Sequence, residues 1–336
     1  MFKLLEGAPK ERPRILNEPL RFKPFPRPRV WGGRKLESLL GKSLPDGQNY
    51  GESWEISDHA SHASEVLGGN FDGKTLRWLM ETQADNILGP TVGKQQQFPW
   101  LIKYLDAQDW LSVQVHPDEK SVEQLWPGEG SKNEAWFILE AVPGSRIYAG
   151  LLPGVNAAQV RAASLAGTVA DLLHQFHPQP GDCLYLPAGT VHAIGCGVLM
   201  AEIQQTSDAT FRLFDWNRKD ATGAGRPLHL EESLACIDWT SGPPHPIRVP
   251  GFGKNPVAGQ IPLVNCPYFK LEYHCQRAKT LLGGTGKLQA VLALSGEGTL
   301  GGIGIQKGET LLFPASMGEI PWAPLHCQEL LLATLP

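Results

Sequence analysis

Residues 180–192 read PGDCLYLPAGTVH and combine a Gly-Asp pair, an apolar run, a Pro-Ala-Gly turn and a histidine. The run 183–186 has the length and composition of a buried strand. Pro187 ends it because proline cannot donate to a sheet ladder, and Gly189 permits the tight turn that follows. The stretch therefore predicts a β-protein in which a turn delivers His192 directly after a strand.

Similar short apolar runs recur along the whole chain. Glycine (37 residues) and proline (28 residues) interrupt the sequence at short intervals, and runs such as WLIKYL (100–105), AWFILEA (135–141) and VLMAEIQQ (198–205) lie between them. Many short strands separated by turn signals are typical of a sandwich or barrel. Helices are expected over only a few segments, residues 73–88, 159–175 and 231–237.

Composition narrows the classes of protein that this chain can be. Its 336 residues are 42% hydrophobic and 19% charged, which is enough apolar material for a large core and argues against disorder. The net charge of -4 and the lack of a long basic stripe argue against a nucleic-acid partner. No run of about 18 apolar residues predicts a membrane span. Six cysteines without a CxxC pair, and no signal-type apolar stretch in residues 1–16, predict reduced thiols in a cytoplasmic protein.

Two parts of the chain resemble each other. Residues 307–319 (KGETLLFPASMGE) repeat the pattern of residues 180–192, and LQAVLALSGEGT (288–299) repeats that of AWFILEAVPGSR (135–146). A duplicated β-unit accounts for both matches, with chance similarity as the alternative. Glu319 stands where the first copy has His192, so the second copy is expected to hold no metal. We expect residues 1–240 to form the main domain, with its N-terminal strands and helical segments, residues 241–254 a linker, and residues 255–336 a smaller β-domain.

Three segments carry candidate metal ligands. In SVQVH (112–116), alternate side chains share one face of a strand, which brings Gln114 and His116 together. Glu134 opens the strand-like run of KNEAWFI (132–138), and His192 follows the turn described above. Each residue alone has an ordinary explanation, a hydrogen-bonded histidine or a surface charge on an edge strand. Together they offer nitrogen and oxygen ligands without a thiolate, a set that suits zinc and also Fe(II) or Mn(II).

Longer stretches resemble the type I mannose-6-phosphate isomerases, in the order and spacing of the short bacterial members. The matching stretches are WGGRKL (31–36), GESWEIS (51–57), FPWLIKYLDA (98–107), LSVQVHPDE (111–119), KNEAWFILEA (132–141) and 185–216. The resemblance implies a mainly β fold, a double-stranded β-helix (cupin or jelly-roll) barrel with a few helices and a second, smaller β-domain. It weakens after about residue 240.

The same resemblance implies the chemistry. One Zn2+ per chain would be bound by Gln114, His116, Glu134 and His192, and the reaction would interconvert mannose 6-phosphate and fructose 6-phosphate by proton transfer between C1 and C2. The partner would be a small sugar phosphate, with neither nucleic acid nor membrane involved, and the protein a monomer or weak homodimer.

Further groups are expected around the metal. By the resemblance, four catalytic residues line the substrate pocket: Lys103, Lys132, Asp208 and Arg212. If residues 201–212 form one regular strand, Glu202 shares a face with Asp208 and Arg212 and lies in position to bind substrate. Arg212 is suited to an oxyanion because its guanidinium is a permanently charged fork, although a structural Asp208–Arg212 pair is the alternative. Ser112 is either a phosphate-binding residue or an ordinary strand serine. The sequence does not identify the catalytic base.

Two other classes of protein fit part of this pattern. Two histidines and a carboxylate also describe the facial triad of non-heme iron oxygenases. A non-catalytic cupin that binds a sugar phosphate would use a similar pocket without turnover. Gln114 and the lysine and arginine groups favour an isomerase of an anionic sugar over the oxygenase.

Overall fold

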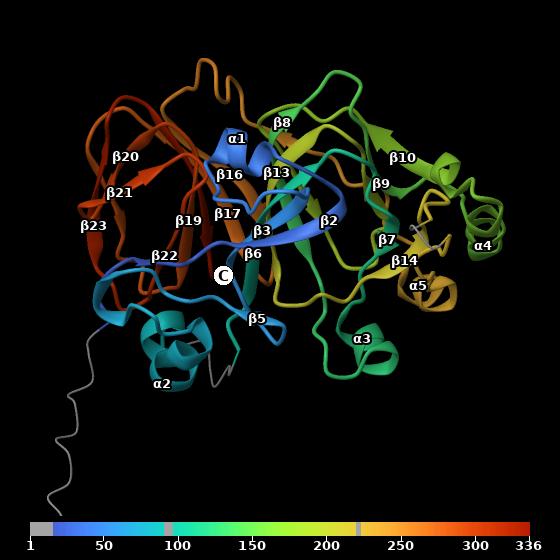
Figure 1. Ribbon diagram of the computed structural model, residues 1–336, viewed down its shortest axis with the longest axis horizontal. Coiled ribbons are helices and arrows are strands. Elements are labelled where there is room, and N and C mark those ends of the chain that lie inside the picture. Colours follow the sequence, from blue (N-terminus) through green and yellow to red (C-terminus); the bar gives the residue numbers. More distant parts are fainter. Residues whose placement is uncertain (1–15, 91–96, 220–222) are drawn as a thin grey trace, which may run out of the picture.

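The computed structural model describes residues 16–90, 97–219 and 223–336. The expectation about a signal segment falls on residues that lie almost wholly outside these ranges. The described chain is mainly β, as predicted. It forms two neighbouring units, one whose main sheets contain strands β2, β3 and β6 to β15 and one that contains β16 to β24 with β1 (Figure 1).

The first unit contains a seven-stranded and a five-stranded sheet. The seven-stranded sheet has, in spatial order, β15 (Ile247–Arg248), β11 (Asp182–Leu186), β8 (Glu134–Ala141), β13 (Val198–Gln205), β6 (Trp100–Ala107), β3 (Tyr50–Ile56) and β2 (Phe25–Gly33). The five-stranded sheet has β10 (Leu173–Phe176), β9 (Ile147–Leu151), β12 (His192–Ile194), β7 (Val113–Val115) and β14 (Phe211–Phe214). Apolar side chains of both sheets, among them Ile138, Met200 and Ile194, form one buried cluster, so the two sheets pack face to face.

The second unit also has two sheets. The six-stranded sheet has β1 (Leu20–Arg21), β22 (Thr310–Phe313), β19 (Gln289–Ser295), β24 (Gln328–Thr334), β17 (Lys270–Gln276) and β16 (Gly259–Asn265). The four-stranded sheet has β18 (Thr280–Gly283), β23 (Glu319–Pro324), β20 (Glu297–Leu300) and β21 (Ile303–Gln306). A hairpin of β4 (Asp58–His59) and β5 (His62–Ala63) stands apart from both units' sheets. An apolar cluster that includes Phe313, Trp322 and Leu332 fills the space between the six- and four-stranded sheets.

The two units share one strand order. The series β11-β8-β13-β6 of the first unit corresponds to β22-β19-β24-β17 of the second, and β10-β9-β12-β7 corresponds to β21-β20-β23-β18. The repeat of residues 180–192 in residues 307–319 matches Leu186 with Phe313, and their register partners, Glu134 and Gln289, are then counterparts. The duplication expected from the sequence therefore has a structural counterpart over eight strands.

A common core joins the units. Residues of β8 alternate, so that Phe137 points away from the five-stranded sheet and stacks on Tyr273 of β17, with ring centroids 6.4 Å apart. Phe252 meets Phe137 at 5.1 Å, and the indole of Trp100 donates to the carbonyl of Tyr268 at 3.0 Å. Strand β1 pairs with β22 of the second unit. The segment 241–254 contributes β15 and the buried Phe252, so it is packed against both units.

Helices are short and lie outside the sheets. They are α1 (Lys35–Leu40), α2 (Leu76–Leu88), α3 (Glu119–Leu125), α4 (Ala157–Ala166) and α5 (Leu230–Cys236), with 3-10 turns at Gly69–Phe71 and Val169–Leu172. The helices expected at 73–88 and 231–237 are confirmed, and α1 and α3 were not expected. The helix expected at 159–175 is wrong beyond Ala166, because Gly167 adopts φ 77° and caps α4, and β10 then begins at Leu173. No helix among the described residues is long and apolar enough to cross a membrane.

The common core predicts a large effect of Phe137→Ala. Phe137 is fully buried between the two units, so its removal leaves a cavity that neighbouring strands cannot close. We expect the free energy of unfolding, measured by urea titration, to fall by about 3–5 kcal/mol. Leu165→Ala, at an exposed position of α4, is the control and should stay within about 0.5 kcal/mol. A small loss for Phe137→Ala would contradict a shared core.

Candidate active site

A cavity of about 330 Å³ opens into the first unit between its two sheets. Strands β2, β3, β6, β8 and β13 supply one wall, and β7, β12 and β14 supply the other. The charged and polar residues around it are Arg29, Glu52, Lys103, Ser112, Gln114, Lys132, Glu134, Glu202, Asp208, Thr210, Arg212, Arg226 and His229. Eight of the ten residues predicted from the sequence are in this set, and His116 and His192 lie behind it against Glu134.

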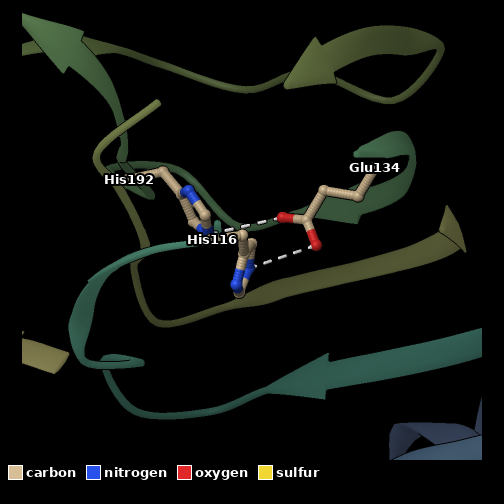
Figure 2. Close-up of side chains that lie close together, drawn as sticks. All are labelled: His116, Glu134 and His192. Carbon is tan, nitrogen blue, oxygen red and sulfur yellow. Dashed lines mark ion pairs between the residues drawn. The ribbon is translucent and has the colours of Figure 1, made fainter. Parts of the chain in front are cut away.

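Three side chains converge on a possible metal position. The ligand atoms of His116, Glu134 and His192 all lie within 4.8 Å of one another (Figure 2). The Nε2 atom of His116 is 3.4 Å from one carboxylate oxygen of Glu134, and that of His192 is 3.3 Å from the other. Strand pairing brings Gln114 beside His192, with the amide Nε2 3.2 Å from the imidazole Nε2. Rotation of that amide by 180° presents its oxygen to the same centre.

Backbone carbonyls orient both imidazoles. The Nδ1 of His116 contacts the carbonyl of Ala209 at 2.8 Å, and the Nδ1 of His192 contacts that of Thr190 at 2.9 Å. When Nδ1–H donates to a carbonyl, the Nε2 lone pair is left for a metal. Burial lowers the pKa of His116 to about 3 and also lowers the pKa of His192. Both rings are therefore neutral near pH 7, which is the state that binds a cation.

The Glu134 carboxylate is ionised although it is almost completely buried. Burial alone would raise its pKa, but the Lys132 ammonium beside it holds the pKa well below its usual range. Lys132 Nζ lies 3.0 Å from Glu134 and 2.9 Å from Nε2 of His116. An anionic oxygen and two neutral nitrogens thus face one another, and this donor set can hold a divalent metal.

A second buried ion pair lies next to this centre. Lys103 on β6 and Glu202 on β13 are register partners, and their charged atoms are 3.1 Å apart. Burial opposes the charge of Lys103, yet Glu202 and Glu52 outweigh it and raise the pKa of the ammonium. Burial raises the pKa of Glu202 to about 7 despite the lysine. The carboxylates beside Lys103 therefore keep this buried side chain charged.

Arg212 reaches the cavity by a different route from the one predicted. Strand β13 ends at Gln205 and β14 begins at Phe211, so residues 201–212 do not form one regular strand. Gln204, near the end of β13, donates to the carbonyl of Ser207 at 2.6 Å across the start of the loop. Arg212 lies beside Gln114 because β14 pairs with β7, and its Nη1 donates to the carbonyl of Pro227 at 2.9 Å.

The contacts of Asp208 and Ser112 bear on the two alternative roles, structural or substrate-binding, that the sequence left open for each. Asp208 is an exposed residue on the loop between β13 and β14, and no ion pair with Arg212 is found among the described residues. A structural Asp208–Arg212 pair therefore does not explain the arginine. Ser112 is buried at the cavity wall, where its hydroxyl donates to the amide oxygen of Gln114 at 3.3 Å.

Sequence reasoning missed several residues around the cavity. Arg29 and Glu52 form a two-point ion pair at 2.9 and 3.0 Å, and Arg226 is held by Asp215. His229 accepts from the backbone N–H of Arg212 at 3.2 Å. Glu52 could have been predicted from the sequence, because it lies inside the motif GESWEIS (51–57). It is on the same face of a strand as Trp54, whose indole N–H donates to it. No motif marks the loop that carries Arg226.

The fold and the site define a class of protein: a two-unit β-protein with a buried centre of two histidines and a carboxylate, inside a cavity rich in cations. Comparison with known proteins identifies the family. Residues 20–135 match the catalytic domain of type I phosphomannose isomerase. The mannose-6-phosphate isomerase ManA of Bacillus subtilis (strain 168) is 34% identical over 321 residues, covering 91% of this chain and 96% of that protein. The mannose-6-phosphate isomerase of Streptococcus mutans is 34% identical over 88% of this chain and 92% of its own length.

Solved structures agree. The crystal structure of the Bacillus subtilis mannose 6-phosphate isomerase superposes with a TM-score of 0.82 at 26% identity, over 94% of this chain and 99% of that one. A putative mannosephosphate isomerase from Archaeoglobus fulgidus, at 22% identity, shares the fold with a TM-score of 0.77 over 96% of this chain and all of its own. The chain belongs to the type I mannose-6-phosphate isomerase family, which confirms the resemblance drawn from its motifs.

The charges around the cavity predict a pH dependence of stability. Burial would raise the pKa of Glu52, but Lys103 and Arg29 hold it at about 2, below the ordinary value of 4.5. The unfolded chain therefore binds a proton at higher pH than the folded chain does, and stability is lost as the pH falls from about 4.5 toward 2. The contribution above this window is on the order of 3 kcal/mol.

Glu52→Gln should lower the free energy of unfolding at pH 7 and reduce its slope against pH between pH 5 and 3. Urea unfolding at several pH values measures both quantities. Glu123→Gln, at an exposed position of α3, removes the same charge outside the cavity and should leave the slope close to that of the unmodified protein. An equal slope for Glu52→Gln and the unmodified protein would show that Glu52 is not held ionised by its neighbours.

Proposed function

We propose that this protein interconverts mannose 6-phosphate and fructose 6-phosphate, with one Zn2+ per chain held by Gln114, His116, Glu134 and His192. The observation that carries the proposal is the convergence of His116, Glu134 and His192 within 4.8 Å at the base of a cation-rich cavity, in a chain of this family. The relatives named above are mannose-6-phosphate isomerases, and the cations suit a phosphorylated sugar.

The residues present fit a zinc ion. The candidate ligands are neutral imidazoles, a carboxylate and an amide, and each imidazole is oriented by a backbone carbonyl. No cysteine is among the residues around the centre. This donor set suits zinc, while Fe(II) and Mn(II) would accept it too. When bound, zinc would supply a Lewis acid that polarises the carbonyl of the open-chain sugar and its neighbouring hydroxyl.

Side chains of the protein would stabilise the negative charge of the intermediate and transfer the proton. The reaction moves a proton between C1 and C2 and passes through an enediolate, so it needs a base and cations beside the developing negative charge. Lys103 stays an ammonium near pH 7 because its pKa is raised, whereas the pKa of Glu202 lies near neutrality. These directions favour Glu202 over Lys103 as the group that accepts and returns a proton, with Lys103 and Lys132 as cations that hold substrate oxygens.

Arg212 would stabilise the enediolate. It is half-buried beside Gln114 and has no carboxylate within ion-pair distance among the described residues, unlike Lys103, Lys132, Arg29 and Arg226. Its charge is therefore available to an anionic ligand. Asp208, at the open side of the cavity, and Ser112, on its wall, would complete substrate binding, with Ser112 near the phosphate.

We propose the finer description of the fold as well. The shared strand order supports two double-stranded β-helix (cupin) barrels, a catalytic domain at residues 1–240 and a smaller one without metal at 255–336, joined by 241–254. Among the described residues, the cluster of His116, Glu134 and His192 is the one candidate metal centre. A cytoplasmic location and a monomer or weak homodimer remain predictions from the sequence.

Metal removal tests the proposal. Elemental analysis of purified protein should give one zinc per chain, and a chelator should abolish turnover of mannose 6-phosphate until zinc is added back. His116→Ala and His192→Ala should lose zinc and activity together, because each removes one of three converging ligands. His274→Ala, a buried histidine of the second unit, is the control and should keep both. Iron with oxygen uptake, or binding of the sugar phosphate without turnover, would instead support the oxygenase or the non-catalytic cupin.

Variants of Arg212 test whether its guanidinium, which has no carboxylate partner among the described residues, stabilises the enediolate. Arg212→Ala and Arg212→Lys should keep zinc and melting temperature while kcat falls, for the alanine variant by roughly 10²–10³, because an interaction made mainly in the transition state is lost. Arg161→Ala, which breaks an exposed ion pair with Glu231 on the helices, is the control and should leave kcat unchanged. A zinc-loaded, stable Arg212→Ala protein with near-normal kcat would exclude the catalytic role.

A further inference from the structure

Trp136 occupies an unusual position beneath the cavity. It follows Glu134 on β8 at the next position of the same face, and its indole packs edge-on to the ring of His192 with centroids 5.3 Å apart. Only 1% of its surface is exposed, yet it lines the cavity. The indole therefore forms part of the floor on which a bound sugar would lie.

The indole N–H of Trp136 is buried without a hydrogen-bond partner among the described residues. Four other tryptophans have a partner for this group: the N–H groups of Trp54, Trp100, Trp216 and Trp322 donate to Glu52, Tyr268, Leu111 and Gln328. An unpaired buried donor destabilises the folded chain, so native proteins rarely keep one without a use. Among the described tryptophans, Trp136 is the one whose buried N–H has no partner, and its side chain lines the cavity.

Packing of the fold does not require a tryptophan at this place. The repeat of residues 180–192 in residues 307–319 matches Leu184 with Leu311, and their register partners make Val291 the counterpart of Trp136. The next strand along then makes Leu332 the counterpart of Glu202, the cross-strand neighbour of Trp136. In the second unit these two aliphatic residues fill the space between the sheets. The first unit has a donor and a carboxylate at the same two positions, and it also has the cavity.

The chemistry of indole limits what Trp136 can do. Its N–H donates one hydrogen bond, accepts none and does not titrate, so the residue can neither take nor return a proton. Its partner must be an oxygen lone pair. The ligands that the cavity suits, open-chain sugar phosphates, offer hydroxyl and carbonyl oxygens at every carbon.

We infer that the Trp136 indole N–H donates a hydrogen bond to an oxygen of the bound sugar phosphate and positions it against the metal centre. The inference rests on the proposed function for the identity of the ligand. Trp136 is thus a substrate-positioning residue in the floor of the cavity, and its unpaired donor is satisfied by the substrate.

Trp136→Phe tests the inference because it removes the N–H and keeps an aromatic ring. We expect zinc content to be unchanged and the melting temperature to be equal or higher, since no protein partner loses a bond. We expect kcat/KM for mannose 6-phosphate to fall about three- to ten-fold, mainly through KM, as for loss of one neutral hydrogen bond. The dissociation constant of mannitol 6-phosphate, an open-chain analogue that cannot isomerise, should rise by a similar factor in titration calorimetry.

Trp322→Phe is the matched control in the second unit. It removes an N–H that donates to Gln328 at 2.7 Å, so we expect a lower melting temperature with unchanged KM and analogue binding. The opposite patterns of the two variants separate positioning from packing. A lower melting temperature with unchanged KM and analogue affinity for Trp136→Phe would overturn the inference.

A measurement on the unmodified protein covers the case in which Trp136→Phe fails to fold or loses zinc. The ¹⁵N–¹H indole signal of Trp136, assigned by difference against Trp136→Leu, should move on addition of mannitol 6-phosphate, and an unmoved signal would overturn the inference. If the unmodified protein binds the analogue but does not turn over mannose 6-phosphate, the proposed function fails while the positioning role stands.

Discussion

The site depends on pairing charges that the first unit removes from water. Glu134, Lys132, Lys103 and Glu202 are each at most 5% exposed, and every one of them has an opposite charge within 3.1 Å. Burying a single one of these charges unpaired would cost several kcal/mol. The pairs therefore act as a set: Glu134 stays ionised because Lys132 is beside it, and Lys103 stays charged because Glu202 and Glu52 face it. A cavity with this many fixed charges is already arranged for an anionic, polyhydroxylated ligand.

Strand alternation determines which residues join that set. On β8, Ala135, Phe137 and Leu139 enter the core shared with the second unit, while Glu134 and Trp136 face the cavity. A shift of the register by one residue would exchange the two groups and place a carboxylate in the apolar core. The stacking of Phe137 on Tyr273 thus opposes the same shift that would remove Glu134, the candidate metal ligand, from the cavity.

The same alternation of side chains along strands explains which parts of the site could be predicted from the sequence. The candidate ligands Gln114, His116, Glu134 and His192 were identifiable because each lies on, or next to, a short strand of clear period, and the turn before His192 has a strong signature. The strand predicted over 201–212 was wrong because a loop at 206–210 interrupts it, and parity says nothing across a loop. Arg29, Arg226 and His229 come from segments without a motif. Their positions depend on how distant parts of the chain pack, and local pattern cannot supply that.

The second unit has the strand order of the first, but its interior is filled with apolar side chains where the first unit has a polar cavity. Its interior is closed by residues such as Phe313, Trp322 and Leu332, and the first unit opens a polar cavity at the corresponding place. A polar cavity contributes little hydrophobic stabilisation, so the strands around it must be held by their other faces. The six-stranded sheet of the second unit covers those faces, since Trp100, Phe137 and Ala201 from three cavity-lining strands all enter the shared core. The second unit thereby keeps the strands that carry Lys103, Glu134 and Glu202 in place, although it contributes no side chain to the cavity itself.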